Sequence, residues 1–96
     1  MNNTENKIYL FTTEGCEGCK IAENLFNKAI DKSDINIKFE VVCCNTDYLF
    51  QVSKLYYIED FPTAVFVKNG INVSRIIGTT TVNEIVKTIN ECFKSY

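Results

Sequence analysis

The chain has 96 residues, of which 46% are hydrophobic and 23% charged, so it suits one globular domain spanning residues 1–96 rather than a disordered segment. A net charge of −2 leaves no basic surface for a phosphate backbone, which excludes nucleic acid as a main partner. No apolar run approaches the length of a membrane span, and residues 1–6, expected to be a loose polar N-terminus, lack the apolar stretch of a secretory signal. We therefore expect a cytoplasmic monomer that contacts no membrane.

The first half of the chain predicts two strands and two helices. A run of β-formers over residues 7–12 indicates a buried strand. The turn-like residues 13–15 open an amphipathic helical pattern, which ends at residues 31–34. A second strand is expected over residues 37–43. Residues 45–47 then offer side chains that cap the free amide groups of a short second helix.

The second half predicts a hairpin followed by a helix. Residues 61–63, Phe-Pro-Thr, interrupt the chain, because proline cannot donate a backbone hydrogen bond. A strand over 64–67 leads to Asn-Gly at 69–70, which favours a tight turn with positive φ before another strand over 72–77. In the last helix, one apolar face carries Val82, Ile85, Val86, Ile89, Cys92 and Phe93.

The order β-α-β-α-β-β-α defines an α/β fold. The first β-α-β unit implies two parallel strands with a right-handed crossover, and the later hairpin implies antiparallel pairing. One four-stranded mixed sheet flanked by three helices accommodates both.

The amino-acid inventory limits the chemistry. The chain has no histidine, which excludes catalytic Ser-His and Cys-His pairs as well as histidine metal ligands. Its five cysteines are an odd number, and cytosolic thiols are usually reduced, so a structural disulfide framework fits poorly.

Cys16 and Cys19 are the candidate catalytic residues. They form a C-x-x-C pair directly after a buried strand and at the start of a helix, where free amide groups and the helix dipole stabilise a thiolate. Cys16 is expected to be the exposed nucleophile, and Cys19, one turn further along, the resolving thiol. Lys20 is expected to support negative charge here and Glu17 to oppose it.

Several motifs together resemble the thioredoxin family. They are Cys16-Glu17-Gly18-Cys19-Lys20, Asp47, Phe61-Pro62-Thr63, Lys68-Asn69-Gly70 and Gly78. The resemblance implies a thioredoxin-like fold and exchange of the Cys16–Cys19 dithiol with protein disulfides, as in a cytosolic protein-disulfide reductase. It implies electrons from a reductase or from glutathione, and no cofactor or metal.

The resemblance also implies how the substrate is held. It implies a cis Phe61–Pro62 bond in a loop beside the dithiol, where the Phe61 backbone pairs with an extended substrate segment. It further implies that Gly78 keeps the neighbouring loop close and flat, so that a protein substrate can approach. The expected substrate-binding residues are Gly15, Glu17, Gly18, Phe61, Pro62 and Gly78.

The chain lacks the two residues that, in thioredoxins, carry protons to and from the dithiol. The buried acid of thioredoxins falls on Leu10 and its lysine partner on Cys43. The stretch before Cys16 is too short for the extra strand and helix that thioredoxins carry there. An alternative function is therefore a binding or adaptor module that docks partners through the Pro62 face with weak or no redox turnover.

The other cysteines and the tyrosines have simpler interpretations. A zinc site usually needs a second C-x-x-C, and the adjacent pair Cys43-Cys44 is a poor substitute because neighbouring strand residues point to opposite faces. They are expected to be core and surface residues of a strand end rather than catalysts, although Cys43 is also a candidate partner for Cys19 in an alternative disulfide. Cys92 is expected to pack in the core. Three tyrosines are expected to lie in the core or at its rim, with no cofactor role: Tyr48, Tyr56 and Tyr57.

Overall fold

Seven elements make up the computed structural model, which describes residues 5–94. They are β1 (Asn6–Thr12), α1 (Glu17–Lys32), β2 (Lys38–Cys43), α2 (Asp47–Leu55), β3 (Thr63–Lys68), β4 (Ile71–Ile77) and α3 (Val82–Phe93). The predicted order and the thioredoxin-like α/β fold are confirmed. The strand ends differ from the prediction by single residues, because pairing with neighbouring strands, rather than composition, sets where a strand ends.

One four-stranded mixed sheet has the strand order β2-β1-β3-β4. β1 pairs with β2 in parallel and with β3 antiparallel, and β3 pairs with β4 antiparallel. In this register Leu10 of β1 lies between Val41 of β2 and Ala64 of β3. β1 and β3 are therefore the central strands, and the first β-α-β unit has the predicted parallel pairing.

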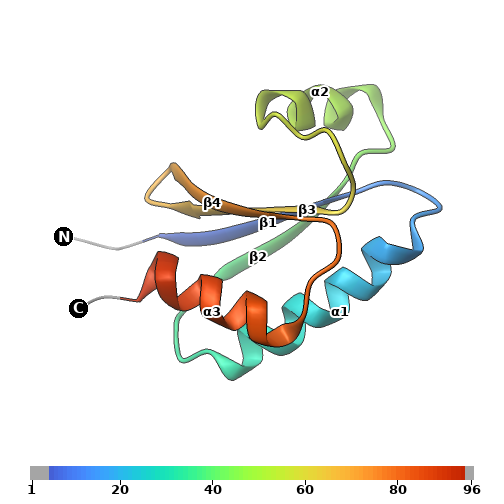
Figure 1. The fold of residues 1–96 in the computed structure, drawn as a ribbon. Helices are drawn as coiled ribbons and strands as arrows, with labels where there is room; N and C mark the ends of the chain where they lie inside the picture. The colour runs from blue at the N-terminus through green and yellow to red at the C-terminus, as the bar shows by residue number, and fades with distance from the viewer. Residues whose placement is uncertain (1–4, 95–96) are drawn as a thin grey trace.

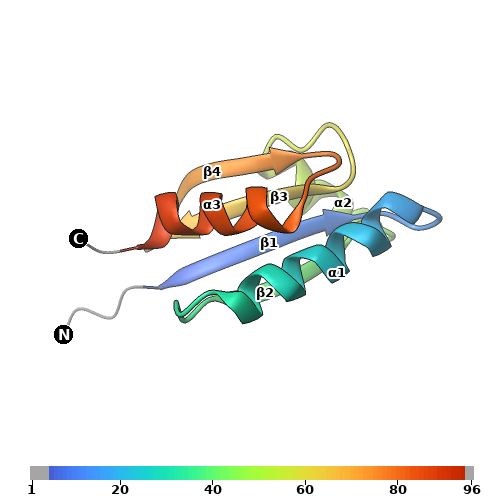
Figure 2. The ribbon, with the colours of Figure 1, turned by 60° about the horizontal axis from the view of Figure 1, so that its bottom comes forward.

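Helices cover both faces of the sheet. Figures 1 and 2 show α1 and α3 side by side on one face and α2 on the other. Between the sheet and the α1–α3 layer lies a core built on Ile8, Leu10, Ala22, Phe26, Ala29, Ala64, Phe66, Ile85, Ile89 and Phe93. A smaller core under α2 contains Phe11, Val42, Cys44, Ile58, Val65 and Val67.

The Asn69-Gly70 turn joins β3 and β4 as predicted. Asn69 has φ 52° and Gly70 has φ 80°, both in the left-handed region that such hairpin turns require. The turn is also tied to the start of β1, since the Asn69 amide donates to the Glu5 carbonyl and the Glu5 amide donates to Asn69 Oδ1, each at 2.8 Å. The hairpin thus helps to fix the N-terminal end of β1.

Replacing Gly70 with alanine is expected to lower the free energy of unfolding by about 1 kcal/mol, because a Cβ is disfavoured at this φ. Urea unfolding followed by circular dichroism measures the change. Gly18→Ala is the matched control, because an added Cβ there would meet its nearest neighbour, Pro62 Cδ, at an ordinary 3.9 Å and Gly18 lies within a helix. Equal losses in the two variants would contradict the assignment of the effect to backbone conformation.

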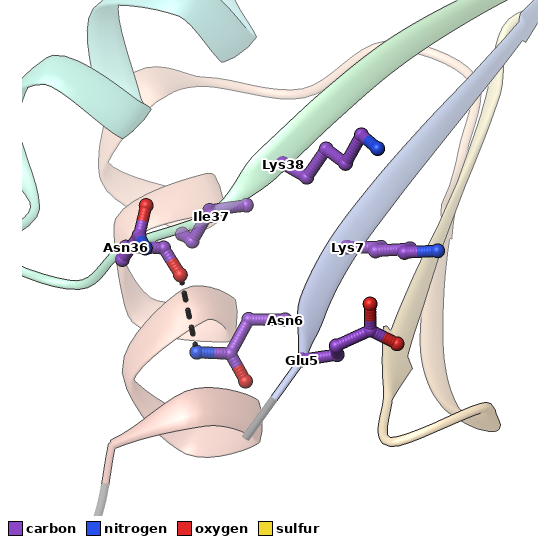
Figure 3. A pocket seen from close by; sticks show the side chains of 6 residues that line it. All are labelled: Glu5, Asn6, Lys7, Asn36, Ile37 and Lys38. Atoms are coloured by element: carbon purple, nitrogen blue, oxygen red, sulfur yellow. Dashed lines mark hydrogen bonds between the residues drawn. The ribbon is translucent and has the colours of Figure 1, made fainter. Parts of the chain in front are cut away.

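The start of the described chain corrects one expectation. Residues 1–4 lie outside the described residues, but Glu5 and Asn6 are held by hydrogen bonds rather than loose, and β1 begins at Asn6. The Asn6 side-chain amide donates to the Asn36 carbonyl at 3.2 Å, as Figure 3 shows, at the edge of a cavity of about 450 Å³. This cavity lies at the opposite end of β1 from the dithiol, so it is separate from the site described below.

Within residues 5–94, no helix has the length and apolar character needed to cross a membrane.

Candidate active site

Cys16 and Cys19 form a disulfide at the start of α1, with their Cα atoms 5.3 Å apart. Cys16 is the N-cap residue of the helix, and its Sγ accepts a hydrogen bond from the Cys19 amide at 3.1 Å. Cys16 is half-buried, whereas only 4% of Cys19 is exposed. An incoming molecule therefore has access to Cys16, while Cys19 is shielded behind it.

Local structure explains this placement. β1 ends at Thr12, and Gly15 turns the chain with φ 72°, a left-handed conformation that suits glycine. The helix then begins directly after Cys16, so the sulfur lies where free amide groups and the positive end of the helix dipole favour an anion. The exposed Glu17 adds negative charge in the first turn and opposes this effect.

The loop around Pro62 lies against the segment between the two cysteines. Pro62 is buried, the Phe61–Pro62 bond is cis, and Pro62 Cδ would lie 3.9 Å from a Cβ added at Gly18. The Gly78 amide donates to the Pro62 carbonyl at 2.8 Å, which joins the loop before α3 to the same group. In Figure 1 the loops that precede α1, β3 and α3 lie at one end of the sheet. Tertiary structure thus gathers three segments that are distant in the sequence.

A cavity of about 350 Å³ opens beside the disulfide, and its wall includes Cys16, Cys19, Lys20 and Cys43. Glu14 and Glu23 also line it, and sequence reasoning did not assign either to the site. The position of the family's acid is occupied by Leu10, which is 1% exposed and packed in the apolar core. The departure noted in the sequence is therefore present in the structure, and no carboxylate lies at that point of β1.

Cys43 shares the cavity with the dithiol but is a free thiol. Because the structure pairs Cys16 with Cys19, we expect the redox midpoint of Cys43→Ser to equal that of the wild type. The midpoint is measured by alkylation in graded dithiothreitol buffers, with Cys92→Ser as the control. A midpoint shifted only in Cys43→Ser would show that Cys43 exchanges with the dithiol.

Cys44 and Cys92 are unsuited to nucleophilic chemistry. Burial raises the pKa of the Cys44 thiol, and a hydrogen bond with Ser53 offsets part of that effect. Burial likewise raises the pKa of Cys92, which packs against the core beneath α3 as predicted. A raised pKa lowers the thiolate fraction at neutral pH, and the thiolate is the reactive form.

A second hollow adjoins the Pro62 loop on the side of α2. Phe50, Lys54, Tyr57, Ile58, Glu59 and Phe61 line this cavity of about 350 Å³. Tyr48 and Tyr57 were expected in the core or rim, but they are 75% and 81% exposed. The helical pattern did not reveal that Tyr57 lies beyond the end of α2, where the chain turns and its side chain points outward.

This fold, with a dithiol at the first turn of α1 beside a cis-proline loop, defines a thioredoxin-fold protein. The thioredoxin family model matches residues 1–91, and the chain belongs to that family. It is 30% identical over 89 residues to thioredoxin H2-1 of Oryza sativa, covering 93% of this chain and 62% of the relative. It is 31% identical over 87 residues to a thioredoxin of Mycoplasma genitalium, covering 90% of this chain and 81% of the relative.

Solved structures agree on the fold. Oxidised thioredoxin O2 of Arabidopsis thaliana superposes with a TM-score of 0.81 at 18% identity, covering 94% of this chain and 76% of that one. A reduced thioredoxin pre-protein of Schistosoma mansoni gives a TM-score of 0.74 at 24% identity, covering 93% and 80%. The chain thus spans less than two thirds of the rice relative but most of the other three.

Proposed function

We propose that this protein is a thiol–disulfide oxidoreductase that reduces disulfides in protein partners. The observation that carries the proposal is the disulfide at the N-terminus of α1, with an accessible Cys16 and a shielded Cys19. A dithiol gives up two electrons when its sulfurs form a disulfide and takes them back when the disulfide is reduced. The exchange therefore needs no organic cofactor or metal. Membership of the thioredoxin family supports the same chemistry.

The proposed reaction begins with the reduced protein. The Cys16 thiolate attacks one sulfur of the substrate disulfide, forming a mixed disulfide and releasing the other substrate sulfur as a thiolate. Cys19 then loses its proton and attacks Cys16 Sγ, which releases the second substrate sulfur and closes the Cys16–Cys19 disulfide. The substrate gains two electrons and the protein loses two, which a reductase or glutathione must return.

The substrate is proposed to bind as an extended segment alongside Phe61, next to the residues around the dithiol. Gly18 and Pro62 lie together and Gly78 is hydrogen bonded to Pro62, so on this side of Cys16 two glycines and the proline leave little side-chain bulk. Such a face admits a polypeptide close to the sulfur. We propose that the protein acts as a monomer in the cytoplasm, with Glu17 and Lys20 flanking the bound segment.

A binding or adaptor role is the second candidate, and the buried Leu10 favours it. Without a carboxylate there, proton transfer to and from Cys19 lacks the group that thioredoxins use, and turnover would be slow. Reduction of insulin disulfides in the presence of dithiothreitol, followed by turbidity, separates the two candidates. Turnover above the dithiothreitol background supports the reductase, whereas partner binding without turnover supports the adaptor.

The reduction potential gives the direction of electron flow. Titration of the Cys16–Cys19 pair against glutathione and dithiothreitol is expected to give a value near or below about −230 mV, as cytosolic reductants have. A value above about −180 mV would indicate an oxidant or isomerase and contradict the proposed direction. The absence of a reversible couple would favour the adaptor.

A further inference from the structure

The second step of the proposed reaction needs a base close to Cys19. The Cys19 thiol has to lose its proton as its sulfur attacks Cys16 Sγ, because the thiolate is the attacking species. Only 4% of Cys19 is exposed, so bulk water has little access to this thiol. The group that takes the proton is therefore expected among the side chains that border Cys19.

The hollow beside the disulfide brings two carboxylates to this thiol. Its volume is about 350 Å³, which gives room for water between side chains that do not touch. Its wall includes these cysteines and charged residues: Glu14, Cys16, Cys19, Lys20, Glu23 and Cys43. Lys20 is a cation and has no lone pair to accept a proton, whereas an ionised carboxylate accepts one readily. Glu14 and Glu23 are therefore the two candidate bases.

Helix geometry distinguishes the two carboxylates. Glu23 follows Cys19 by four residues on α1, so the two side chains share one face of the helix with their Cβ atoms about 5–6 Å apart. Side chains on a helix lean toward its N-terminus, so Glu23 leans toward Cys19. Glu14 lies in the turn before Cys16 and outside the helix. Glu23 is thus the carboxylate placed next to the resolving sulfur.

The charges around Glu23 do not favour one sign alone. On the wall of the hollow, α1 contributes the cation Lys20, the turn before it contributes the anion Glu14, and β2 contributes the free thiol of Cys43. A strong excess of either charge would hold the carboxyl in a single protonation state. With one charge of each sign nearby, Glu23 can both accept a proton and give it up.

We propose that Glu23 is the proton carrier of Cys19. In substrate reduction its carboxylate takes the Cys19 proton, directly or through one water, while Cys19 Sγ bonds to Cys16 Sγ and the substrate sulfur leaves as a thiolate. When an external thiolate later attacks Cys16 and reopens the disulfide, Cys19 leaves as a thiolate and Glu23 returns the proton. This inference rests on the proposed oxidoreductase function. It assigns the proton transfer to a residue of α1 in a chain whose position 10 is the buried, apolar Leu10.

The test separates the two steps with a symmetrical aromatic disulfide whose thiol product is coloured, mixed with an equal amount of reduced protein in a stopped-flow instrument. Attack by Cys16 releases the first coloured thiol at a rate that rises with concentration. Attack by Cys19 releases the second at a rate independent of concentration. Glu23→Gln keeps the size of the side chain but removes the base, and it is expected to slow the second release by about 100-fold, the low end of general-base contributions, because water partly replaces an exposed carboxylate. The first release is expected to be unchanged.

Two variants are the controls for this measurement. Glu14→Gln removes the other carboxylate of the hollow with the same change in charge and is expected to keep both rates. Cys19→Ser is expected to show the first release alone, which identifies the second with Cys19. Because Glu23 is exposed on α1, its replacement is expected to leave the circular dichroism spectrum and the urea midpoint unchanged.

An external base gives a readout that a merely structural role would not change. In Glu23→Ala, which leaves space beside Cys19, acetate at constant ionic strength is expected to speed the second release in proportion to its concentration. The wild type already holds a carboxylate there, so acetate is expected to leave its rate unchanged.

Three outcomes would overturn the inference. In the first, Glu23→Gln resolves the mixed disulfide as fast as the wild type. In the second, Glu14→Gln slows the second release as much as Glu23→Gln, which would assign the effect to the total charge of the hollow. In the third, acetate accelerates the wild type and Glu23→Ala equally. Failure of the wild type to release the second thiol would instead count against the proposed function, because the dithiol would then not close on itself.

Discussion

Replacing Cys16 with serine is expected to abolish disulfide reduction, lowering kcat by more than about 1,000-fold, on the scale seen when a catalytic nucleophile is removed. The hydroxyl of serine does not ionise near neutral pH, so the helix N-terminus has no thiolate to stabilise. Insulin reduction measures the loss. Because Cys16 is the half-buried N-cap residue that precedes α1, and serine is a favoured N-cap residue, the variant is expected to fold normally when reduced.

A second variant, Cys19→Ser, tests whether Cys19 is the thiol that releases the substrate. Cys16 can still attack the substrate, but no second thiol releases it, so a mixed disulfide with the substrate is expected to accumulate. Mass spectrometry of the protein incubated with a peptide disulfide detects it as an added peptide mass. Accumulation on Cys16→Ser instead, through Cys19, would reverse the assigned roles, although only 4% of Cys19 is exposed.

Phe66→Ala is expected to cause the largest loss of stability, about 3–5 kcal/mol. Phe66 is fully buried in the central strand β3, and its ring lies 6.2 Å from that of Phe26 in α1 and 6.0 Å from that of Phe93 in α3, measured between centroids. Truncation leaves a cavity where the sheet and both helices meet. Since a domain of this size is stable by about 5–15 kcal/mol, a large share of the total is lost.

Urea unfolding followed by circular dichroism measures this change, and Ile71→Ala is the matched control. Ile71 is an apolar residue of the adjacent strand β4, but it is 66% exposed, so its truncation is expected to change stability by only about 0.5 kcal/mol. Similar losses in the two variants would mean that the core does not centre on Phe66.

Much of the fold follows from local patterns in the sequence. The apolar periodicity of α1 and α3, the Thr46 cap of α2 and the Asn69-Gly70 turn each depend on residues close together in the chain, and the structure has all of them. The order of the seven elements then restricts the topology, because one right-handed β-α-β crossover and one hairpin leave few ways to arrange four strands in a sheet. Elements with strong local signals were therefore predictable.

The dithiol was also predictable, because its spacing and its place between a strand and a helix are local features. Cys16 as N-cap and a buried Cys19 follow from the helix geometry alone. The contact between Gly18 and Pro62, the bond between Gly78 and Pro62 and the position of Cys43 beside the dithiol join distant segments. From the sequence, the family resemblance implied only that the Pro62 loop lies beside the dithiol, and the individual contacts are determined by the packing of the sheet.

The conformation of Tyr57 shows where the sequence alone was insufficient. Left-handed backbone is usually marked by glycine or asparagine, so a tyrosine there gives no local signal. Arg75, 18 residues away, holds this turn through its hydrogen bonds to the Tyr56 and Tyr57 carbonyls. The sequence by itself determined the helices, the strands and the reactive pair, since these depend on short-range periodicity and capping. Only the tertiary structure decided the left-handed backbone of Tyr57 and the surface around Pro62, because long-range hydrogen bonds and packing can override local preference.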